Sequence, residues 1–243
     1  MNDRVLMTRL EAIPAQATLW RQGKGRPLVT LTYAQSLDGS IAARRGYPLD
    51  LSGPLSRVFT HRLRALHDAI LVGIGTVLAD NPCLNVRLVP GRNPQPVILD
   101  SRLRFPSYAR LLKENAHPWI ATLENADPVR QEDLESRGAK VIRLPQGAGG
   151  GIELTALLDW LTAQGIACLM VEGGAQVITS FLSSRLVDQV IITIAPVLVG
   201  GLRVLDSSPL TPERPLPRLA QVSFHQLGED LVIWGRPEWT GRE

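Results

Sequence analysis

The sequence predicts an α/β domain with a mostly parallel sheet flanked by helices. Short, continuous apolar runs alternate with amphipathic segments along the chain, and the connections between them are short. Such runs suit strands buried on both faces, and their alternation with helices is typical of parallel sheets. The chain has 243 residues, of which 44% are hydrophobic and 20% charged, so it can bury a sizeable core. We expect a single domain over residues 27–243, preceded by an extension over residues 1–26.

The strands are expected in a definite order. Residues 28–34 alternate in polarity and are rich in β-branched side chains, which favours a strand. Near the end of the chain, residues 220–227 and 231–234 are separated by a short turn and predict an antiparallel hairpin, which makes the sheet mixed. Between these elements lie six short apolar runs, at residues 69–72, 96–99, 119–122, 141–144, 168–171 and 190–194.

Four helices are expected between the strands. Pro54 suits the first turn of a helix in which apolar side chains recur at intervals of three and four residues. Asp127 is a suitable cap for the second helix, and Gly138 is suited to end it. The four expected segments are 54–66, 127–138, 154–165 and the residues that follow Gly174.

Charge and hydropathy argue against nucleic-acid and membrane partners. The 26 basic and 23 acidic residues leave a net charge of +3, the basic residues are scattered, and aromatic residues make up only 5%. A nucleic-acid binder usually concentrates its basic residues on one element. The longest apolar stretch, residues 190–202, is interrupted by Pro196 and is too short to span a bilayer. The N-terminus carries charged residues and no apolar signal region, so we expect a cytoplasmic protein.

The cysteines and histidines do not form a metal-binding pattern. The chain has two cysteines, Cys83 and Cys168, and four histidines, none at the spacing that zinc sites use. A zinc deaminase centre is therefore excluded, and no metal is expected. Two reduced thiols are typical of a cytoplasmic protein.

Two glycine-rich segments follow predicted strands. Residues 72–78 resemble the start of a dinucleotide-binding fingerprint, but Leu78 occupies the place of its last glycine, so a simple tight turn is an equally good interpretation. Gly173 and Gly174 follow the strand at 168–171 and open a helix whose free amide groups suit a pyrophosphate. The preceding Glu172 is placed either to bind a ligand or to cap this helix.

Polar residues also follow other predicted strands. Asp38 and Gly39 form a turn signal after the first strand, and Asp80 closes the segment after the second. Asp100 and Ser101 follow the third, with arginines at 102 and 104 close by. Together these residues predict a cofactor site at one edge of the sheet.

The order of these motifs resembles the pyrimidine reductases of riboflavin biosynthesis. The matching blocks are Ser36–Gly39, Leu63-Arg64, Gly73–Pro82, Leu99–Ser101, Val171–Gly174, Leu186–Asp188 and Ala195-Pro196, and the resemblance extends from about residue 28 to residue 234. This family includes the reductase half of RibD and the stand-alone archaeal and fungal reductases. The resemblance implies a dihydrofolate-reductase-like fold, NADPH as cofactor and a homodimer. It also implies reduction of the ribosylamino side chain of a pyrimidine 5′-phosphate to the ribitylamino form.

The resemblance also implies roles for individual residues. Those matching positions that contact NADPH are Ala34, Thr76, Asp80, Ser101, Gly173, Gly174, Ala175 and Gln176. Those matching positions that hold the phosphorylated substrate are Arg64, Leu84, Arg87 and Glu172. Glu172 is expected to orient the pyrimidine for hydride transfer. Asp38 is the nearest candidate proton carrier, with a water or the substrate phosphate as alternatives.

One loop departs from the family pattern. Residues 48–50 read Pro-Leu-Asp where the bifunctional enzymes have Ser-x-Trp, so the contacts of this loop with the substrate are not implied. Arg44 and Arg45 in the same loop either bind the substrate or are solvated. Ser101, with Arg102 or Arg104, is suited to the 2′-phosphate of NADPH.

Several alternatives stay open at this point. A pterin reductase of the dihydrofolate reductase type needs a carboxylate on the helix at 54–67, which contains arginines and neither Asp nor Glu. A catalytically silent nucleotide-binding protein on the same fold is a second alternative. The sequence leaves open whether the substrate is the diamino pyrimidine or its deaminated form. The apolar runs at 190–194 and 197–199 favour a homodimer.

Overall fold

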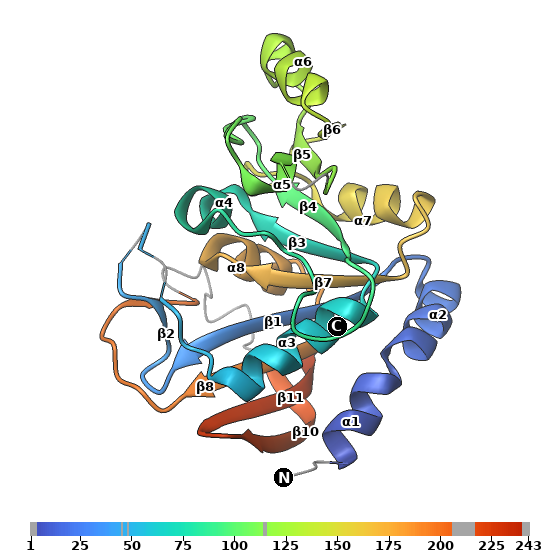
Figure 1. Cartoon of the computed structure of the whole chain (residues 1–243). Coiled ribbons are helices and arrows are strands. Elements are labelled where there is room, and N and C mark those ends of the chain that lie inside the picture. The colour runs from blue at the N-terminus through green and yellow to red at the C-terminus, as the bar shows by residue number, and fades with distance from the viewer. Residues whose placement is uncertain (1–3, 45, 48, 114–115, 206–216, 240–243) are drawn as a thin grey trace.

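A nine-stranded mixed sheet forms the centre of the computed structural model, which describes residues 4–44, 46–47, 49–113, 116–205 and 217–239 (Figure 1). The strand order is β10-β11-β8-β1-β7-β3-β4-β5-β6. The bounds are β1 Leu28–Ser36, β3 Ala69–Gly73, β4 Gln95–Leu99, β5 Trp119–Leu123, β6 Lys140–Leu144, β7 Cys168–Gly173, β8 Gln189–Ala195, β10 Pro217–Leu227 and β11 Asp230–Trp239. A separate pair joins β2 (Ser40–Ala42) to β9 (Leu202–Arg203).

The pairing confirms the predicted fold class. Strand β1 lies between β7 and β8 and runs parallel to both, and the ladder continues in parallel from β7 through β3, β4 and β5 to β6. The C-terminal hairpin β10–β11 pairs antiparallel with β8. The hairpin is longer than predicted and contains an irregularity between Ala220 and Ser223.

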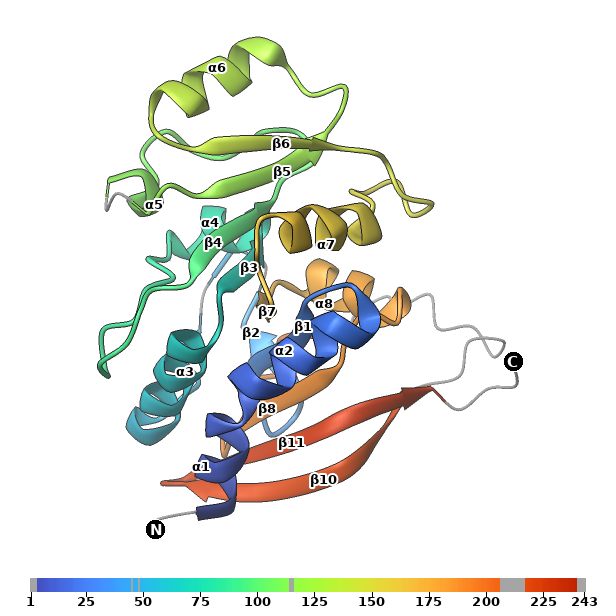
Figure 2. The same cartoon turned by 90° about the vertical axis from the view of Figure 1, so that its right-hand side faces the viewer.

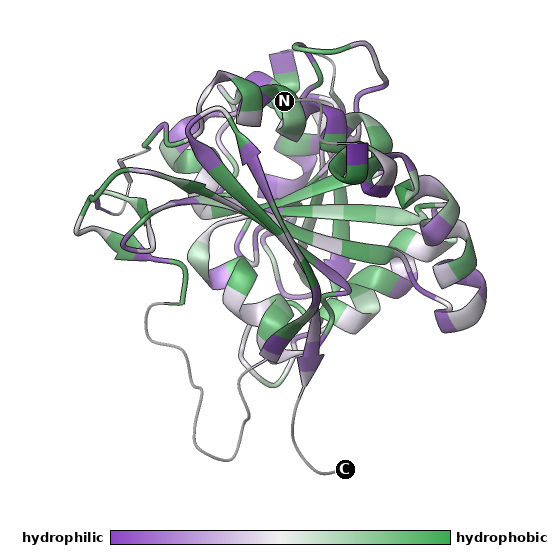
Figure 3. Cartoon of the chain, turned by 90° about the horizontal axis from the view of Figure 1, so that it is seen from below, coloured by the Kyte–Doolittle hydropathy of each residue, from purple (hydrophilic) through white to green (hydrophobic). Residues whose placement is uncertain are grey.

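Helices cover both faces of the sheet. One face packs against α7 (Leu154–Ala163) and α8 (Ala175–Ser183), whose apolar residues form one core cluster with strand residues such as Val29 and Leu71. Residues of the opposite face, such as Ile70 and Met170, belong to two further clusters. The helices on that side are α3 (Pro54–Leu66), α4 (Ile74–Asp80), α5 (Arg110–Lys113) and α6 (Pro128–Ser136), together with the two N-terminal helices. Figure 3 shows that the strands are largely hydrophobic and that the helices carry both hydrophobic and hydrophilic residues, as expected for helices that cover a buried sheet.

Two helices precede the first strand and were not predicted. Helix α1 spans Arg4–Glu11 and α2 spans Ile13–Lys24, where the sequence suggested only an extension. Leu6, Leu10 and Ile13 are buried against the sheet, so residues 4–24 are part of the packed structure. The loop expected from residue 22 begins only at Gly25, whose φ of 69° ends the helix.

The four predicted helices are all present. In two of them, a hydrogen bond to a carboxylate fixes the residue at which the helix begins. The Asp127 carboxylate accepts a hydrogen bond from the Val129 amide and caps α6. Helix α3 begins after Gly53, whose amide donates to the buried carboxylate of Asp230 at 2.8 Å. Because Asp230 opens β11, this bond attaches the C-terminal hairpin to the first turn of α3. No helix in the described parts of the chain is long and apolar enough to cross a bilayer.

Candidate active site

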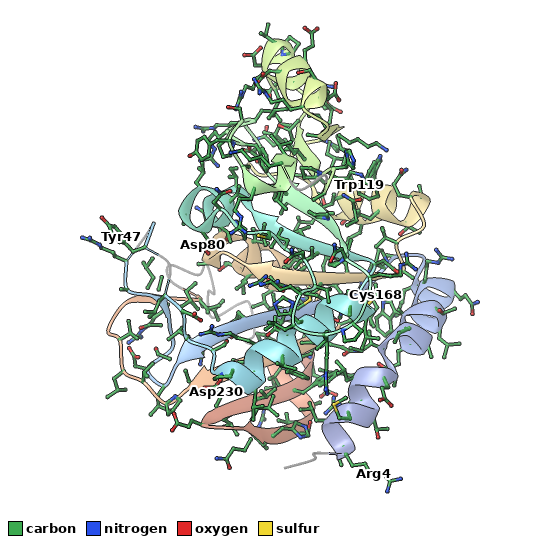
Figure 4. All side chains as sticks on the ribbon, in the orientation of Figure 1. Arg4, Tyr47, Asp80, Trp119, Cys168 and Asp230 are labelled. Carbon is green, nitrogen blue, oxygen red and sulfur yellow. The ribbon has the colours of Figure 1, made fainter. Side chains whose placement is uncertain are left out.

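The predicted site residues gather around the carboxyl ends of the central strands. Strands β1, β7, β3 and β4 are consecutive in the sheet and run parallel, so their C-terminal ends lie along one edge of the sheet. Figure 4 shows Asp80 at this edge, whereas Cys168, the first residue of β7, lies at the opposite edge. Open α/β sheets bind their ligands at the edge formed by the carboxyl ends.

Arg64 and Glu172 form a bidentate ion pair between α3 and β7. The Arg64 Nε donates to Glu172 Oε1 and the Nη2 donates to Oε2, both at 2.6 Å. The side chains are only 13% and 14% exposed. Burial disfavours the charged guanidinium, but the attraction of Glu172 outweighs it and raises the pKa of Arg64. Glu172 is therefore not a helix cap, and Arg64 is not a surface arginine.

The loop after α4 completes this cluster. Arg64 also donates from Nη1 to the Asn85 carbonyl at 3.2 Å, and the exposed Arg87 donates to the Asn85 side-chain oxygen at 3.0 Å. Leu84 is buried and has a positive φ of 51°, so it turns the chain beside Asn85. The structure thus brings together all four residues that the sequence assigned to substrate binding.

His61 is part of the same cluster and was not predicted. It is buried on α3, one turn before Arg64, and its Nδ1 accepts the Arg87 amide at 3.2 Å. Burial and the nearby charges of Arg64 and Arg87 lower the pKa of His61 to about 4. A neutral imidazole is required for Nδ1 to accept this bond, so His61 holds the loop without adding charge. The spacing of His61 and Arg64 at i and i+3 was the available sequence signal.

The N-terminal ends of α4 and α8 meet beside the ends of β3 and β7. Gly174 has a φ of 76°, and a Cβ added there would lie 3.2 Å from Thr76 Oγ1. At Gly73 an added Cβ would come within 2.8 Å of Val177, so these glycines allow the two helices to approach closely. The first amide groups of α8, from Ala175 and Gln176, have no partner within the helix and are free to bind an anion. Residues 74–80 form a helix, so the interpretation of this segment as a tight turn was wrong.

The remaining cofactor candidates lie on β1, at the C-terminal end of α4 and just after β4. Ala34 is on β1 and pairs with Thr193 of β8, and Asp80 ends α4. Ser101 directly follows Asp100, which is fully buried at the end of β4 and accepts the Phe105 amide at 2.8 Å. Arg104 pairs with Asp100 at 3.5 Å. Arg102 is exposed beside Ser101.

Asp38 fixes the loop after β1. Its carboxylate accepts hydrogen bonds from the Ser36 and Ser40 hydroxyls and from the amides of Val199 and Gly200, at 2.6–2.9 Å. These donors, led by Ser36, hold the pKa of Asp38 well below its usual range. The residue thus joins the loop after β1 to the segment after β8 as a carboxylate.

The loop that departs from the family pattern is only partly described. Arg44 lies 3.6 Å from the ring centroid of Tyr47, and Asp50 pairs with Arg57 of α3 at 2.7 Å. Arg45 and Pro48 lie outside the described residues. Figure 4 places Tyr47 at the outer end of this loop. Across the described part of the chain, no group of three or more His, Cys, Asp or Glu is placed to hold a metal.

Comparison with known proteins identifies the same family that the order of the sequence motifs resembles. The RibD C-terminal domain family matches residues 27–233. The 2,5-diamino-6-ribosylamino-4(3H)-pyrimidinone 5′-phosphate reductase of Methanothermobacter thermautotrophicus is 38% identical over 214 residues, which cover 86% of this chain and 97% of the relative. The reductase of the same name from Archaeoglobus fulgidus is 38% identical, covering 72% of this chain and 83% of the relative.

Solved structures show the same architecture. The riboflavin biosynthesis reductase of Saccharomyces cerevisiae superposes with a TM-score of 0.72 at 31% identity, covering 93% of this chain and 99% of that one. RibD of Acinetobacter baumannii gives a TM-score of 0.77 at 27% identity, covering 92% of this chain. The chain spans 61% of the length of this RibD.

Proposed function

This chain belongs to the RibD C-terminal domain family of riboflavin-pathway reductases, and we propose that it reduces the ribosylamino side chain of a pyrimidine 5′-phosphate with NADPH. The observation that carries the proposal is the Arg64–Glu172 pair, which lies beside the glycine-lined junction of α4 and α8. An anchored carboxylate next to an anion-binding helix terminus suits a site that takes a pyrimidine and a dinucleotide together.

The residues at the helix junction fit a nicotinamide dinucleotide. Gly174 leaves space that any side chain would fill, and the free amides of Ala175 and Gln176 suit a pyrophosphate. We assign four further NADPH contacts around this junction, to Thr76, Asp80, Ala34 and Ser101. Ser101 and the exposed Arg102 favour NADPH over NADH, because a 2′-phosphate needs hydroxyl and cationic partners. When bound, NADPH supplies the hydride that reduces C1′ of the opened imine form of the substrate.

The ion pair and the loop after α4 are assigned to the substrate. Glu172, held in place by Arg64, accepts hydrogen bonds from the pyrimidine and positions C1′ for hydride transfer. Arg87, exposed and held through its amide by His61, binds the substrate phosphate together with the part of Arg64 that faces the loop. Asp38 is assigned a positioning role, because a carboxylate that accepts four hydrogen bonds has no proton to donate.

The oligomer and the cellular location belong to the same proposal. Phe224 and Leu231 on the hairpin are 65% and 38% exposed, and Leu198 after β8 is 78% exposed. Apolar surface of this kind on neighbouring elements suits the interface of a homodimer. Cys83 and Cys168 are thiols and form no disulfide with each other, which fits a reducing cytoplasm. Light scattering at micromolar concentration tests the dimer, and a monomeric mass of 26.6 kDa would contradict it.

The decisive test is turnover by the purified protein. NADPH oxidation is followed with the diamino pyrimidine ribosylaminophosphate, with its deaminated form and with dihydrofolate, and NADH replaces NADPH in a parallel series. We expect turnover of one or both ribosylaminopyrimidines, a higher kcat/KM with NADPH than with NADH, and none with dihydrofolate. Tight NADPH binding without turnover of any substrate would favour the catalytically silent alternative and overturn the proposal.

A further inference from the structure

A polar cavity lies on the opposite side of the fold from the candidate active site. Its volume is about 210 Å³, and it opens between the N-terminal helices and the C-terminal hairpin. Figure 2 shows α1 beside β10 and β11. The cavity lies at the amino edge of the parallel strands, because Gln189 is the first residue of β8. The six lining residues are Arg9, Gln16, Gln189, Gln221, Trp234 and Arg236.

Two arginines face this cavity without a carboxylate partner among the described residues. Arg9 donates to the Ser223 hydroxyl at 2.6 Å and to the Gln221 and Trp234 carbonyls at 3.3 and 3.4 Å, all of them neutral acceptors. Its guanidinium lies 4.8 Å from the Trp234 ring centroid. Arg9 and Arg236 line the same cavity with like charges, and burial together with the charge of Arg236 lowers the pKa of Arg9.

The rest of the lining adds neutral donors. The Trp234 indole donates to Gln189 Oε1 at 3.2 Å, and Gln189 Nε2 donates to Gln16 Oε1 at 2.9 Å. This chain of hydrogen bonds engages Gln16 through its oxygen, and its amide NH₂ has no partner among the residues that the structure describes. Gln221 has a φ of 49° at the irregularity in the hairpin, which displaces this part of β10 from regular pairing.

We propose that this cavity binds a phosphate group, as the free ion or on a small ester. Two guanidinium groups that converge on one cavity are suited to a doubly charged oxyanion, because each can donate two hydrogen bonds to it. The free amide of Gln16 adds a neutral donor. The six residues come from α1, α2, β8 and both strands of the hairpin, so a bound phosphate would connect the N-terminal helices to the hairpin.

Thermal unfolding in phosphate and in chloride of equal ionic strength tests this proposal. With phosphate about tenfold above its Kd, we expect the wild-type Tm to rise by about 3–5 °C. Arg236→Gln should abolish this rise. It should also melt at or above the wild-type temperature in chloride, because it removes the repulsion from Arg9. Arg218→Gln makes the same charge change on an exposed residue of the same hairpin and should retain the rise.

Three further measurements keep the outcome clear. Arg87→Gln weakens the phosphate site assigned to the substrate, so a rise in Tm that disappears in Arg87→Gln and persists in Arg236→Gln would overturn the proposal. No rise in the wild-type protein would also overturn it. If Arg236→Gln does not fold, Gln16→Ala, which removes the amide donor of the cavity, replaces it and should reduce the rise. Repeating the series with a simple sugar phosphate distinguishes an ester from the free ion: a rise with phosphate alone assigns the cavity to the ion.

Discussion

Arg64 and Glu172 are separated by 108 residues in the chain, yet two hydrogen bonds of 2.6 Å join them in parallel. The pair connects the last turn of α3 to the end of β7 and leaves each side chain largely buried. Because each charge compensates the other, neither can be removed without leaving an unpaired charge in a poorly hydrated place.

Replacing Glu172 should affect mainly kcat, whereas replacing Arg64 should affect mainly KM and the stability of the fold. Glu172→Gln keeps the shape of the side chain and should lower kcat more than it raises KM, because the reacting atoms lose their alignment. Arg64→Ala should raise KM by about one to two orders of magnitude, with NADPH affinity nearly unchanged. It should also destabilise the fold by about 3–5 kcal/mol, since it leaves the Glu172 charge unpaired.

Steady-state kinetics and thermal melts on both variants check these expectations, and Arg62→Ala on the exposed side of the same helix is the control. Full activity of Arg64→Ala would show that the substrate is bound elsewhere.

Two glycines at helix N-termini give a matched pair of substitutions. Gly174→Ala forces a side chain into a backbone with a φ of 76° and places its Cβ 3.2 Å from Thr76 Oγ1. Gly75→Ala meets open space at an ordinary φ. We expect Gly174→Ala to weaken NADPH binding at least tenfold, as measured by fluorescence titration, and Gly75→Ala to leave it within about twofold. Equal effects of the two substitutions would contradict the assignment of this junction to the pyrophosphate.

Asp38→Asn separates a positioning role from a proton-transfer role. Loss of the carboxylate weakens two hydrogen bonds within the loop after β1 and two that join this loop to the segment at 199–200, so the Tm should fall. Turnover at saturating substrate should persist, and the pH profile of kcat should keep its shape. A general acid usually contributes a factor of about 10²–10⁴, so a loss of this size with an unchanged Tm would identify Asp38 as the proton donor. Asp50→Asn, on an exposed side chain, is the control.

Two buried histidines make stability depend on pH. The pKa of His61 and that of His67 are both lowered to about 4, chiefly by burial, from an ordinary value of 6.5. Between these values the unfolded chain binds protons that the folded chain excludes, so the free energy of unfolding is fully retained above pH 6.5 and falls as the pH approaches 4. Urea unfolding at a series of pH values measures this slope, which reaches about 1.4 kcal/mol per pH unit for each group.

His67→Gln isolates one of the two contributions. His67 bonds to the Leu63 carbonyl and the Thr30 hydroxyl inside the core. The variant will be less stable at neutral pH. Between pH 6.5 and 4 its unfolding should take up one proton fewer, so its free energy of unfolding should fall less steeply as the pH decreases. An unchanged slope would mean that His67 is protonated in the folded protein.

The sequence predicted the sheet and its edge better than it predicted contacts between distant residues. The strands carry a local signal because they are uniformly apolar, and Gly174 and Asp38 could be placed at strand ends from their neighbours alone. The helices at residues 4–24 were missed because the glycines at 23 and 25 suggested a loop, although Leu6, Leu10, Ile13 and Ala17 already repeat at helical spacing.

The pairing of Arg64 with Glu172 carries no local signal at all. The resemblance implies a substrate role for each residue, but which residue it pairs with depends on how α3 lies across β7. The same is true of Asp38, which accepts hydrogen bonds from the amides of residues 199 and 200, about 160 residues later in the sequence. Asp230, which accepts the Gly53 amide just before α3, is a third example.

The strand order also determines when the molecule can assemble during synthesis. Strand β1 emerges first, but both of its partners, β7 and β8, are translated only after residue 167. Until then its apolar residues have no neighbouring strand, whereas β3, β4, β5 and β6 pair in the order in which they are made. Pairing between such distant segments is slow, and an unpaired apolar strand is a site for aggregation. On the ribosome, the middle of this sheet is therefore completed after its β3–β6 side, and Val29 and Leu31 of β1 lack the packing of α7 and α8 until those helices are made.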